Sequence, residues 1–297
     1  MKALHARILF FCILLACAGL VHAQTNAHYP AGVEGIKGAS LPPPGLYIRD
    51  YNYTYFSNDF SKGGPPSFDL LANVQAPRLV FITTKKVLGG YYGADFIVPL
   101  VYQDLDMTGF RGSDFGLGDI FVEPITLSWH LKQADFSFGY GFWAQSGDHN
   151  KTDPIAPGKG FWTHMLTGGV TIYPDKGKTW SFSALNRYEI SQKRNETGIT
   201  PGQYWTLEWG LAKSASKTVE LGFVGYIQAQ TTSASGTGTS SLKDHVIGLG
   251  PEITLACPKL GLSTSIRYFH ETDAQRRPQG NVFNVIFTRL IKGPATK

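Results

Sequence analysis

Residues 135–145 read DFSFGYGFWAQ, with a large apolar residue at every second position. In an extended strand these residues point to one side, while small or polar residues and one Trp point to the other. The first face carries Phe136, Phe138, Tyr140, Phe142 and Ala144, and the second carries Ser137, Gly139, Gly141, Trp143 and Gln145. An apolar outer face and a mostly small or polar inner face are typical of a strand that crosses a membrane in a β-barrel.

The same alternation recurs in other parts of the chain. Residues 204–211 alternate between Tyr, Thr, Glu and Gly on one face and Trp and Leu on the other, and residues 92–103 and 247–255 are similar. This parity predicts that Phe138 and Trp209 face lipid, while Glu208 and Glu252 face the lumen. Arg49 and Asp50 are adjacent, so one of them must face lipid if a strand runs through both.

The connections between the expected strands alternate in length. Twelve strands are expected at about 46–57, 77–87, 90–105, 116–130, 135–146, 161–173, 180–191, 203–213, 219–230, 243–255, 260–272 and 280–290. Long polar connections are expected at 58–76, 106–115, 147–160, 192–202, 231–242 and 273–279, with short turns at 88–89, 131–134, 174–179, 214–218 and 256–259. Short periplasmic turns and long external loops are typical of outer-membrane barrels. We therefore expect an all-β fold, an antiparallel up-and-down transmembrane barrel of about twelve strands, with both termini in the periplasm.

A soluble β-sandwich or a lipocalin-like barrel is the alternative fold. Its strands would also alternate, but its apolar face would be internal and its connections need not alternate in length. No segment after Ala23 has 18 consecutive apolar residues, so a mature chain in a membrane must cross it as strands of a closed barrel.

The first 23 residues resemble a secretory signal peptide. Lys2 and Arg7 supply the positive end, and residues 8–20 form an apolar run too short to span a bilayer. Cleavage after Ala23 would leave Gln24 as the first residue, with lipoprotein processing at Cys17 as the alternative. The chain is therefore expected to be exported to the outer membrane of a Gram-negative cell. The expected division is a signal peptide at 1–23, a Pro/Gly-rich segment at 24–45 and a barrel at 46–297.

Composition argues against several other classes of protein. The net charge of +5 falls to +3 without Lys2 and Arg7, which is too weak and too scattered to indicate nucleic-acid binding. Only Cys257 remains after the leader, so neither an intramolecular disulfide nor a cysteine metal site is expected. No cofactor or metal is expected.

Segment 24–45 shows no strand alternation. Its three consecutive prolines, Pro42 to Pro44, favour an extended polyproline conformation and offer no backbone donors. Two interpretations stay open, a periplasmic tail or a segment that enters and narrows the lumen. In the second, the candidate residues for contact with the lumen are His28, Tyr29, Glu34 and Lys37.

Charged residues on the inward parity define a candidate lumen. They are Asp95, Asp119, Glu123, Arg187, Glu189, Glu208, Glu252 and Arg267. Six acids and two arginines do not form the basic lining that a channel for acidic sugars needs. Trp143 and Tyr226 share the inward parity and could stack on a flat apolar solute. The charges could equally form a paired, purely structural interior.

Several motifs resemble an outer-membrane family named for the MetA pathway of phenol degradation. They are His28-Tyr29-Pro30, Gly32-Val33-Glu34-Gly35-Ile36, Leu41-Pro42-Pro43-Pro44-Gly45-Leu46-Tyr47, Gly116-Leu117-Gly118-Asp119-Ile120 with Glu123-Pro124, and Gly139-Tyr140-Gly141-Phe142-Trp143-Ala144 with Gly147-Asp148. The resemblance covers essentially the whole mature chain. It implies an outer-membrane barrel that passes hydrophobic or aromatic compounds, and it carries over no catalytic or binding residues.

The expected function is therefore a channel or transporter for small hydrophobic or aromatic compounds, with outer-membrane lipid as its surroundings. A non-conducting barrel with a structural or adhesive role is the alternative. An enzyme is a third possibility that we do not expect, since Ser128 and His130 are the only Ser/His pair at same-face spacing. The oligomeric state stays open.

Overall fold

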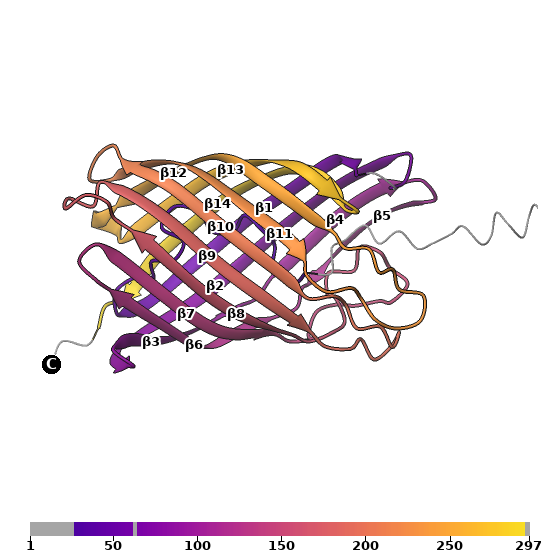
Figure 1. Cartoon of the computed structure of the whole chain (residues 1–297), viewed down its shortest axis with the longest axis horizontal. Helices are drawn as coiled ribbons and strands as arrows, with labels where there is room; N and C mark the ends of the chain where they lie inside the picture. Colours follow the sequence, from indigo (N-terminus) through magenta and orange to yellow (C-terminus); the bar gives the residue numbers. More distant parts are fainter. Residues whose placement is uncertain (1–26, 62–63, 295–297) are drawn as a thin grey trace, which may run out of the picture.

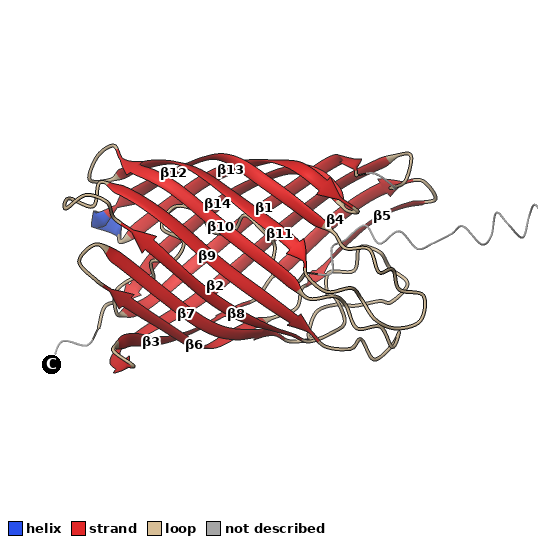
Figure 2. Ribbon diagram, in the orientation of Figure 1, coloured by secondary structure: helices blue, strands red, loops and turns tan. Residues whose placement is uncertain are grey.

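The computed structural model describes residues 27–61 and 64–294, in which fourteen strands and one short 3-10 helix form a barrel (Figures 1 and 2). The strands are β1 (Gly45–Phe60), β2 (Phe68–Val87), β3 (Gly90–Ile97), β4 (Leu100–Met107), β5 (Phe110–Leu117), β6 (Phe121–His130), β7 (Ala134–Trp143), β8 (Thr163–Ile172), β9 (Trp180–Ser191), β10 (Tyr204–Ser214), β11 (Val219–Gln230), β12 (His245–Cys257), β13 (Leu262–Gln275) and β14 (Pro278–Lys292). The helix η1 is Pro258–Leu260. The expected signal peptide lies outside the described residues.

The fourteen strands occupy twelve positions around the barrel. The long strand β2 pairs with both β3 and β4, which are two halves of one strand separated by Val98-Pro99. The next position is likewise shared by β5 and β6, separated by residues 118–120. All pairs are antiparallel, and β1 pairs with both β14 and β2, which closes the sheet. The expected twelve-stranded antiparallel barrel is confirmed.

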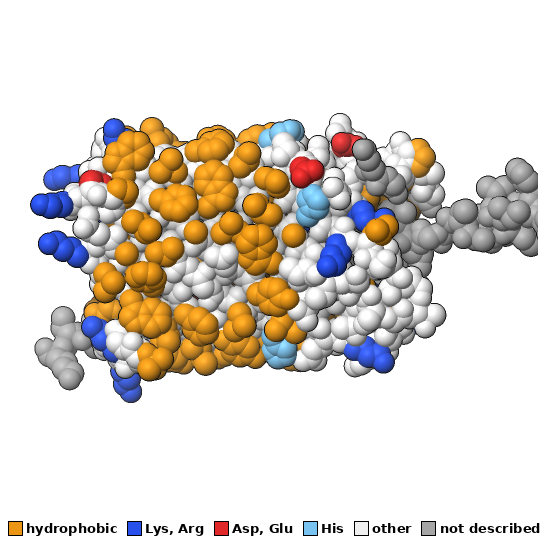
Figure 3. Space-filling view, in the orientation of Figure 1, with side chains coloured by type: hydrophobic (Ala, Val, Ile, Leu, Met, Phe, Trp, Pro, Cys, Tyr) orange, Lys and Arg blue, Asp and Glu red, His pale blue; other side chains and the backbone are white. Residues whose placement is uncertain are grey.

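Apolar side chains cover the outside of the barrel. Phe138, Leu221 and Phe223 on β7 and β11 point outward and are about half exposed, at 43%, 50% and 51%. Figure 3 shows the apolar side chains of this face as a broad band. Most of the Lys and Arg side chains in this view lie at the end that carries the short turns. Such a band matches hydrocarbon, and the ladder closes around the barrel, with β5 paired on one side only, to β4. No helix in the described residues is long and apolar enough to cross a membrane.

Three of the expected long loops are wrong in extent. Residues 61–67 alone connect β1 to β2, Thr108-Gly109 connect β4 to β5, and residues 276–277 connect β13 to β14. The long connections in the structure are 144–162, 192–203 and 231–244. Residues expected in loops at 58–76, 106–115 and 273–279 mostly extend the strands. Several of their outward side chains, including Asp69 and Asp106, are polar, so these strand ends resembled loops.

We expect Phe138→Arg to impair folding into bilayers. A charged Arg or Lys on the lipid face at mid-membrane costs roughly 2–4 kcal/mol. Urea titration followed by heat-modifiable gel mobility measures the loss of folding free energy. Phe138→Leu serves as the apolar control. Equal stability of the Arg and Leu variants would contradict the outward placement of this side chain.

Candidate functional site: the lumen

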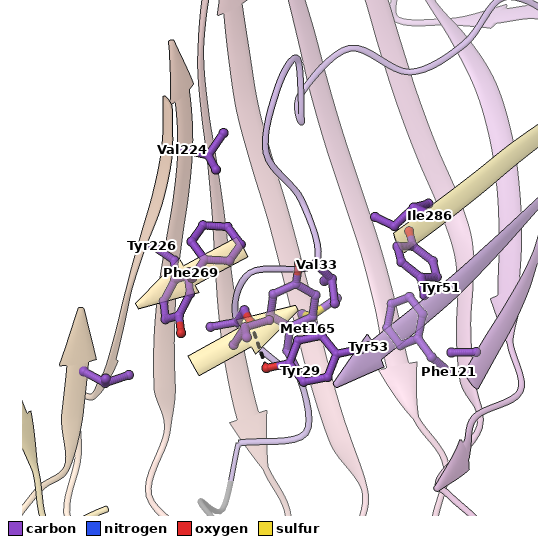
Figure 4. Close-up of a cluster of buried hydrophobic side chains, with 14 of the residues drawn as sticks. Tyr29, Val33, Tyr51, Tyr53, Phe121, Met165, Val224, Tyr226, Phe269 and Ile286 are labelled. Carbon is purple, nitrogen blue, oxygen red and sulfur yellow. Dashed lines mark hydrogen bonds between the residues drawn. The ribbon is translucent and has the colours of Figure 1, made fainter. Parts of the chain in front are cut away.

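The segment before β1, residues 27–44, lies inside the barrel (Figures 1 and 4). It starts near the long loops, where the His28 ring bonds to the hydroxyl of Thr163 at the first position of β8. It ends near the short turns, where the Ser40 hydroxyl donates to Asp135 at the beginning of β7. Because the segment has no strand partner, its backbone groups need partners on the barrel wall.

Glu208 on β10 is the wall residue with most bonds to this segment. Its carboxylate accepts hydrogen bonds from the backbone N–H groups of Gly32 at 3.0 Å and Glu34 at 2.9 Å. The Tyr29 hydroxyl and Arg187 also donate to it, both at 2.6 Å. Gly32 has a φ of 87°, which favours glycine, so the chain can turn tightly around the carboxylate. The segment is thus held at one buried charge by charge-assisted hydrogen bonds.

Further wall residues bind the segment on either side of Glu208. Glu189 accepts from the N–H groups of His28 and Tyr29 at 2.8 and 3.0 Å, and Glu252 accepts from that of Ile36 at 2.9 Å. The carbonyl oxygens accept from Arg267 (to Val33, 2.7 Å), Gln228 (to Tyr29, 2.9 Å), Ser183 (to Gly35, 3.0 Å) and Asn284 (to Gly32, 3.3 Å). Donors and acceptors of the wall are therefore matched to the segment along its length.

Glu34 completes a central ion cluster. Its members are Glu34, Arg49, Arg78, Asp95, Glu123, Arg187 and Glu208. Arg49 donates to Glu34 at 2.7 Å. Arg78 donates twice to Asp95, at 2.9 and 2.8 Å, and once to Glu123 at 3.2 Å. The removal of one partner from such a buried network leaves a charge without compensation, which is strongly destabilising.

The central ion cluster separates two cavities. The upper cavity, on the side of the long loops, has a volume of about 250 Å³, and the lower one has about 270 Å³. The upper lining is rich in apolar and aromatic side chains, including Tyr51, Tyr53, Tyr55, Val74, Phe121, Trp143 and Met165. The lower lining is rich in hydroxyl and charged groups, including Thr126, Ser137, Thr167, Ser265 and Arg267. Glu34, Arg78, Glu123 and Arg187 line both, so they form the partition.

The upper cavity has apolar walls because the inward face of β2 changes from charged to apolar along the strand. Arg78 faces the central ion cluster, whereas Leu70, Val74 and Ala76 further up the strand line the cavity. Beyond them, Phe68, Leu70, Leu105 and Ile155 form a buried apolar cluster with Phe60 and Phe110 at its edge. The outward side chains at this level, Asp69 and Asp104, are exposed and polar. The wall therefore continues above the apolar band with its apolar side turned inward. Figure 4 shows the part of this lining around Tyr29, Tyr53 and Met165.

Asp119 joins the segment to the longest loop. It lies in the interruption between β5 and β6 and accepts from the backbone N–H groups of Ser146 (3.1 Å), Gly147 (2.9 Å) and Lys159 (2.8 Å). The His28 ring lies 3.0 Å from its second oxygen. One carboxylate thus fixes both loop 144–162 and the start of the segment. In the described part of the chain, no group of three or more His, Cys, Asp or Glu residues could hold a metal ion.

A family model described as "Putative MetA-pathway of phenol degradation" matches residues 53–287. The chain belongs to this family. Among solved structures, the barrel is similar to the COG4313 outer membrane channel from Pseudomonas putida F1, with a TM-score of 0.76 and 13% identity over 89% of this chain and 100% of that one. The family member described here is thus an outer-membrane β-barrel.

Two autotransporter domains are more distant structural relatives of this family member. The β domain of Bordetella BrkA matches with a TM-score of 0.54 and 14% identity, over 83% of this chain and 99% of that one. The translocator domain of NalP from Neisseria meningitidis matches with a TM-score of 0.51 and 13% identity, over 97% and 96%. These likenesses concern the fold alone. The comparison with curated proteins gave no match.

The structure brings the lumen candidates of the sequence together inside this family barrel. Asp95, Asp119, Glu123, Trp143, Arg187, Glu189, Glu208, Tyr226, Glu252 and Arg267 are all buried, each at most 6% exposed. The Trp143 ring stacks on that of His28 at 5.7 Å and packs on Phe121 at 4.8 Å. The Tyr226 hydroxyl donates to Glu271 at 2.8 Å. Lys37 pairs with Glu220, outside the central ion cluster.

Sequence reasoning missed several lumen residues. Arg78 was not among the candidates, and Arg49, for which the sequence left the choice between lipid and lumen open, binds Glu34. Glu271 accepts from the hydroxyls of Tyr55 and Tyr226 and was expected only as part of a strand end. The alternating tyrosines at 51, 53 and 55 were the signal that could have identified an aromatic inner face on β1.

We expect acidification to weaken docking of the segment. Burial lowers the pKa of His28 from 6.5 to about 4, although the hydrogen bond to Asp119 opposes the shift. A released His28 would bind a proton below pH 6.5, while the docked ring stays neutral down to about pH 4. Docking therefore loses about 1.4 kcal/mol per pH unit as the pH falls through this window, and is unaffected above it.

Hydrogen exchange of residues 28–36 in His28→Gln and in the wild type, compared at each pH from 7 to 4, measures this effect. The other charged groups that act on His28, namely Asp119, Glu189, Lys159 and Arg194, are the same in both proteins. A pH dependence that is identical in the two proteins would exclude His28 as its source.

Proposed function

We propose that this outer-membrane barrel is a channel for small hydrophobic or aromatic compounds. The observation that supports this proposal best is the upper cavity, whose tyrosines, Trp143 and aliphatic side chains open toward the external loops. Ligand cavities that are mostly apolar, with a few polar groups, bind small organic molecules. Aromatic side chains favour flat partners through offset or edge-to-face packing.

The size of the upper cavity fits a single substituted aromatic ring. An apolar cavity of about 150 Å³ in an engineered protein accepts benzene. The volume of about 250 Å³ found here leaves room for additional substituents. Polar side chains at its edges, such as Gln103 and Gln228, could orient a solute that also carries a polar group.

Passage to the periplasm would require the segment to shift. The central ion cluster separates the cavities, and Glu34 of the segment is one of its members. A displaced segment would remove Glu34 and connect the apolar cavity with the polar one below. The same obstruction favours the alternative, a non-conducting barrel with a structural or adhesive role, if the segment never moves.

We infer that solutes pass without chemical conversion. Ser128 is buried, whereas the ring of His130 lies 3.2 Å from Asp135 at the rim of the barrel. No hydrogen bond joins Ser128 to His130 among the described residues. A nucleophile activated by a base within hydrogen-bond reach is therefore not formed by this pair.

Uptake of toluene or phenol into proteoliposomes tests the channel. Val74→Trp should reduce uptake several-fold, because the indole ring that replaces the small valine side chain fills the upper cavity. Leu79→Trp on the lipid-facing side of the same strand is the matched control and should transport as the wild type does. Uptake by neither the wild type nor a variant without residues 24–44 would favour the structural or adhesive role.

A further inference from the structure

The outer surface of the barrel carries a stripe of polar side chains on β1 and β2. It consists of Asp50, Asn52 and Thr54 on β1 with Asn73 and Gln75 on β2, and is called the outer polar stripe here. The amides of Asn52 and Gln75 donate to Asp50 at 3.2 and 3.5 Å, and the Thr54 hydroxyl donates to Asn73 at 2.8 Å. Intervening residues such as Tyr51, Tyr53 and Val74 line the lumen, so the stripe has the outward parity.

The outer polar stripe lies at the depth of the hydrocarbon. Asp50, Asn52 and Thr54 pair across the ladder with Phe287, Val285 and Phe283, which also point outward. Asp50 is five residues beyond the periplasmic start of β1, or roughly 12 Å along the membrane normal for a strand tilted by about 40°. An apolar band of about 25 Å places Asp50 near the midplane, with the other four residues in the outer half.

On β13 and β14, outward Tyr268 and His270 bond to Asn281, whereas the outward faces of β10 to β12 are mostly apolar. The outward residues of β10 to β12 include Leu207, Trp209, Leu211, Leu221, Phe223, Leu249 and Ile253. Asn186 on β9 is a single polar residue, and its oxygen accepts from Trp205 at 3.2 Å. A carboxylate and three amides that face acyl chains are costly, because hydrocarbon offers no hydrogen-bond partner. Such groups in membranes usually face other protein surfaces.

We propose that the outer polar stripe is the interface through which two copies of this chain associate side by side in the outer membrane. The stripe is self-complementary, because Asn52, Asn73 and Gln75 each carry a donor and an acceptor. A two-fold axis brings the same patch of both copies together, so complementarity within one stripe is sufficient.

Apolar side chains surround the stripe and extend the interface. Phe56, Leu71, Phe283 and Phe287 are each between 37% and 43% exposed and lie on the same strands or next to them. They would pack against their counterparts, while the polar groups bond at the centre. An acyl chain could cover these apolar groups equally well, but it offers nothing to Asp50, Asn52 or Gln75. The polar centre therefore selects a protein partner.

Cysteine cross-linking in proteoliposomes tests the interface. Cys257, the one thiol among the described residues, is removed by Cys257→Ser, and Asn52→Cys and Asn73→Cys are compared with Leu207→Cys on the outward face of β10. We expect a bifunctional maleimide to give covalent dimers of both stripe variants and little dimer of the control. Equal yields at all three positions, or no dimer at the stripe, would overturn the proposal.

Native mass spectrometry of the full barrel in nanodiscs gives an independent result. The wild type should be dimeric, and the combined variant Asp50→Leu, Asn52→Leu, Gln75→Leu should be monomeric with an intact, heat-modifiable fold. The combination Leu207→Ile, Leu211→Ile, Leu221→Ile is the matched control and should remain dimeric. A monomeric wild type that carries lipopolysaccharide, lost in the stripe variant, would overturn the proposal and assign the stripe to lipid.

Discussion

The carboxylate of Glu208 holds the N-terminal segment in the lumen, and the shape of the solute pathway depends on this contact. It gathers two backbone N–H groups, one tyrosine hydroxyl and Arg187 at distances of 2.6 to 3.0 Å. A hydrogen bond to a charged group contributes about 1.5–3 kcal/mol, and a buried acceptor left without donors costs more. Since the segment makes no strand ladder, these side-chain contacts replace the backbone pairing that holds the wall together.

The contact with Glu208 also positions Glu34 in the central ion cluster. Arg49 and Arg78 point into the lumen from β1 and β2, and without Glu34 the Arg49 guanidinium would lose its acidic partner. The docked segment thus compensates charges of the wall, while the wall satisfies the backbone of the segment. This mutual dependence makes the segment part of the folded barrel, although it contributes no strand. It also places a charged partition between the apolar cavity and the polar one.

The strands could be predicted from sequence wherever the outer face is apolar. On β7, Phe136 and Phe138 alternate with Ser137 and Gly139, and the bilayer requires that pattern. The pattern reverses on β2 above Ala76, where Leu70 and Val74 point inward and Asp69 points to water. The outward residues of this stretch include Asn73 and Gln75 as well as Asp69, so the apolar outer face is missing and the stretch was interpreted as a loop.

The position of the segment could not be decided from sequence. Its partners are far away in the chain, and Glu34 and Glu208 are 174 residues apart. Only a folded barrel brings such groups within bonding distance, which is why a periplasmic tail and a lumen segment were equally consistent with the residues. The side on which Arg49 points could not be decided for the same reason, because its partner Glu34 lies in that segment.

Single-channel conductance of Glu208→Ala in planar bilayers tests most directly whether this carboxylate keeps the lumen divided. The variant removes the acceptor of four hydrogen bonds and leaves Arg187 without its partner, so the segment should leave the lumen. We predict a conductance several-fold above that of the wild type. A folded Glu208→Ala barrel whose conductance equals that of the wild type would contradict it.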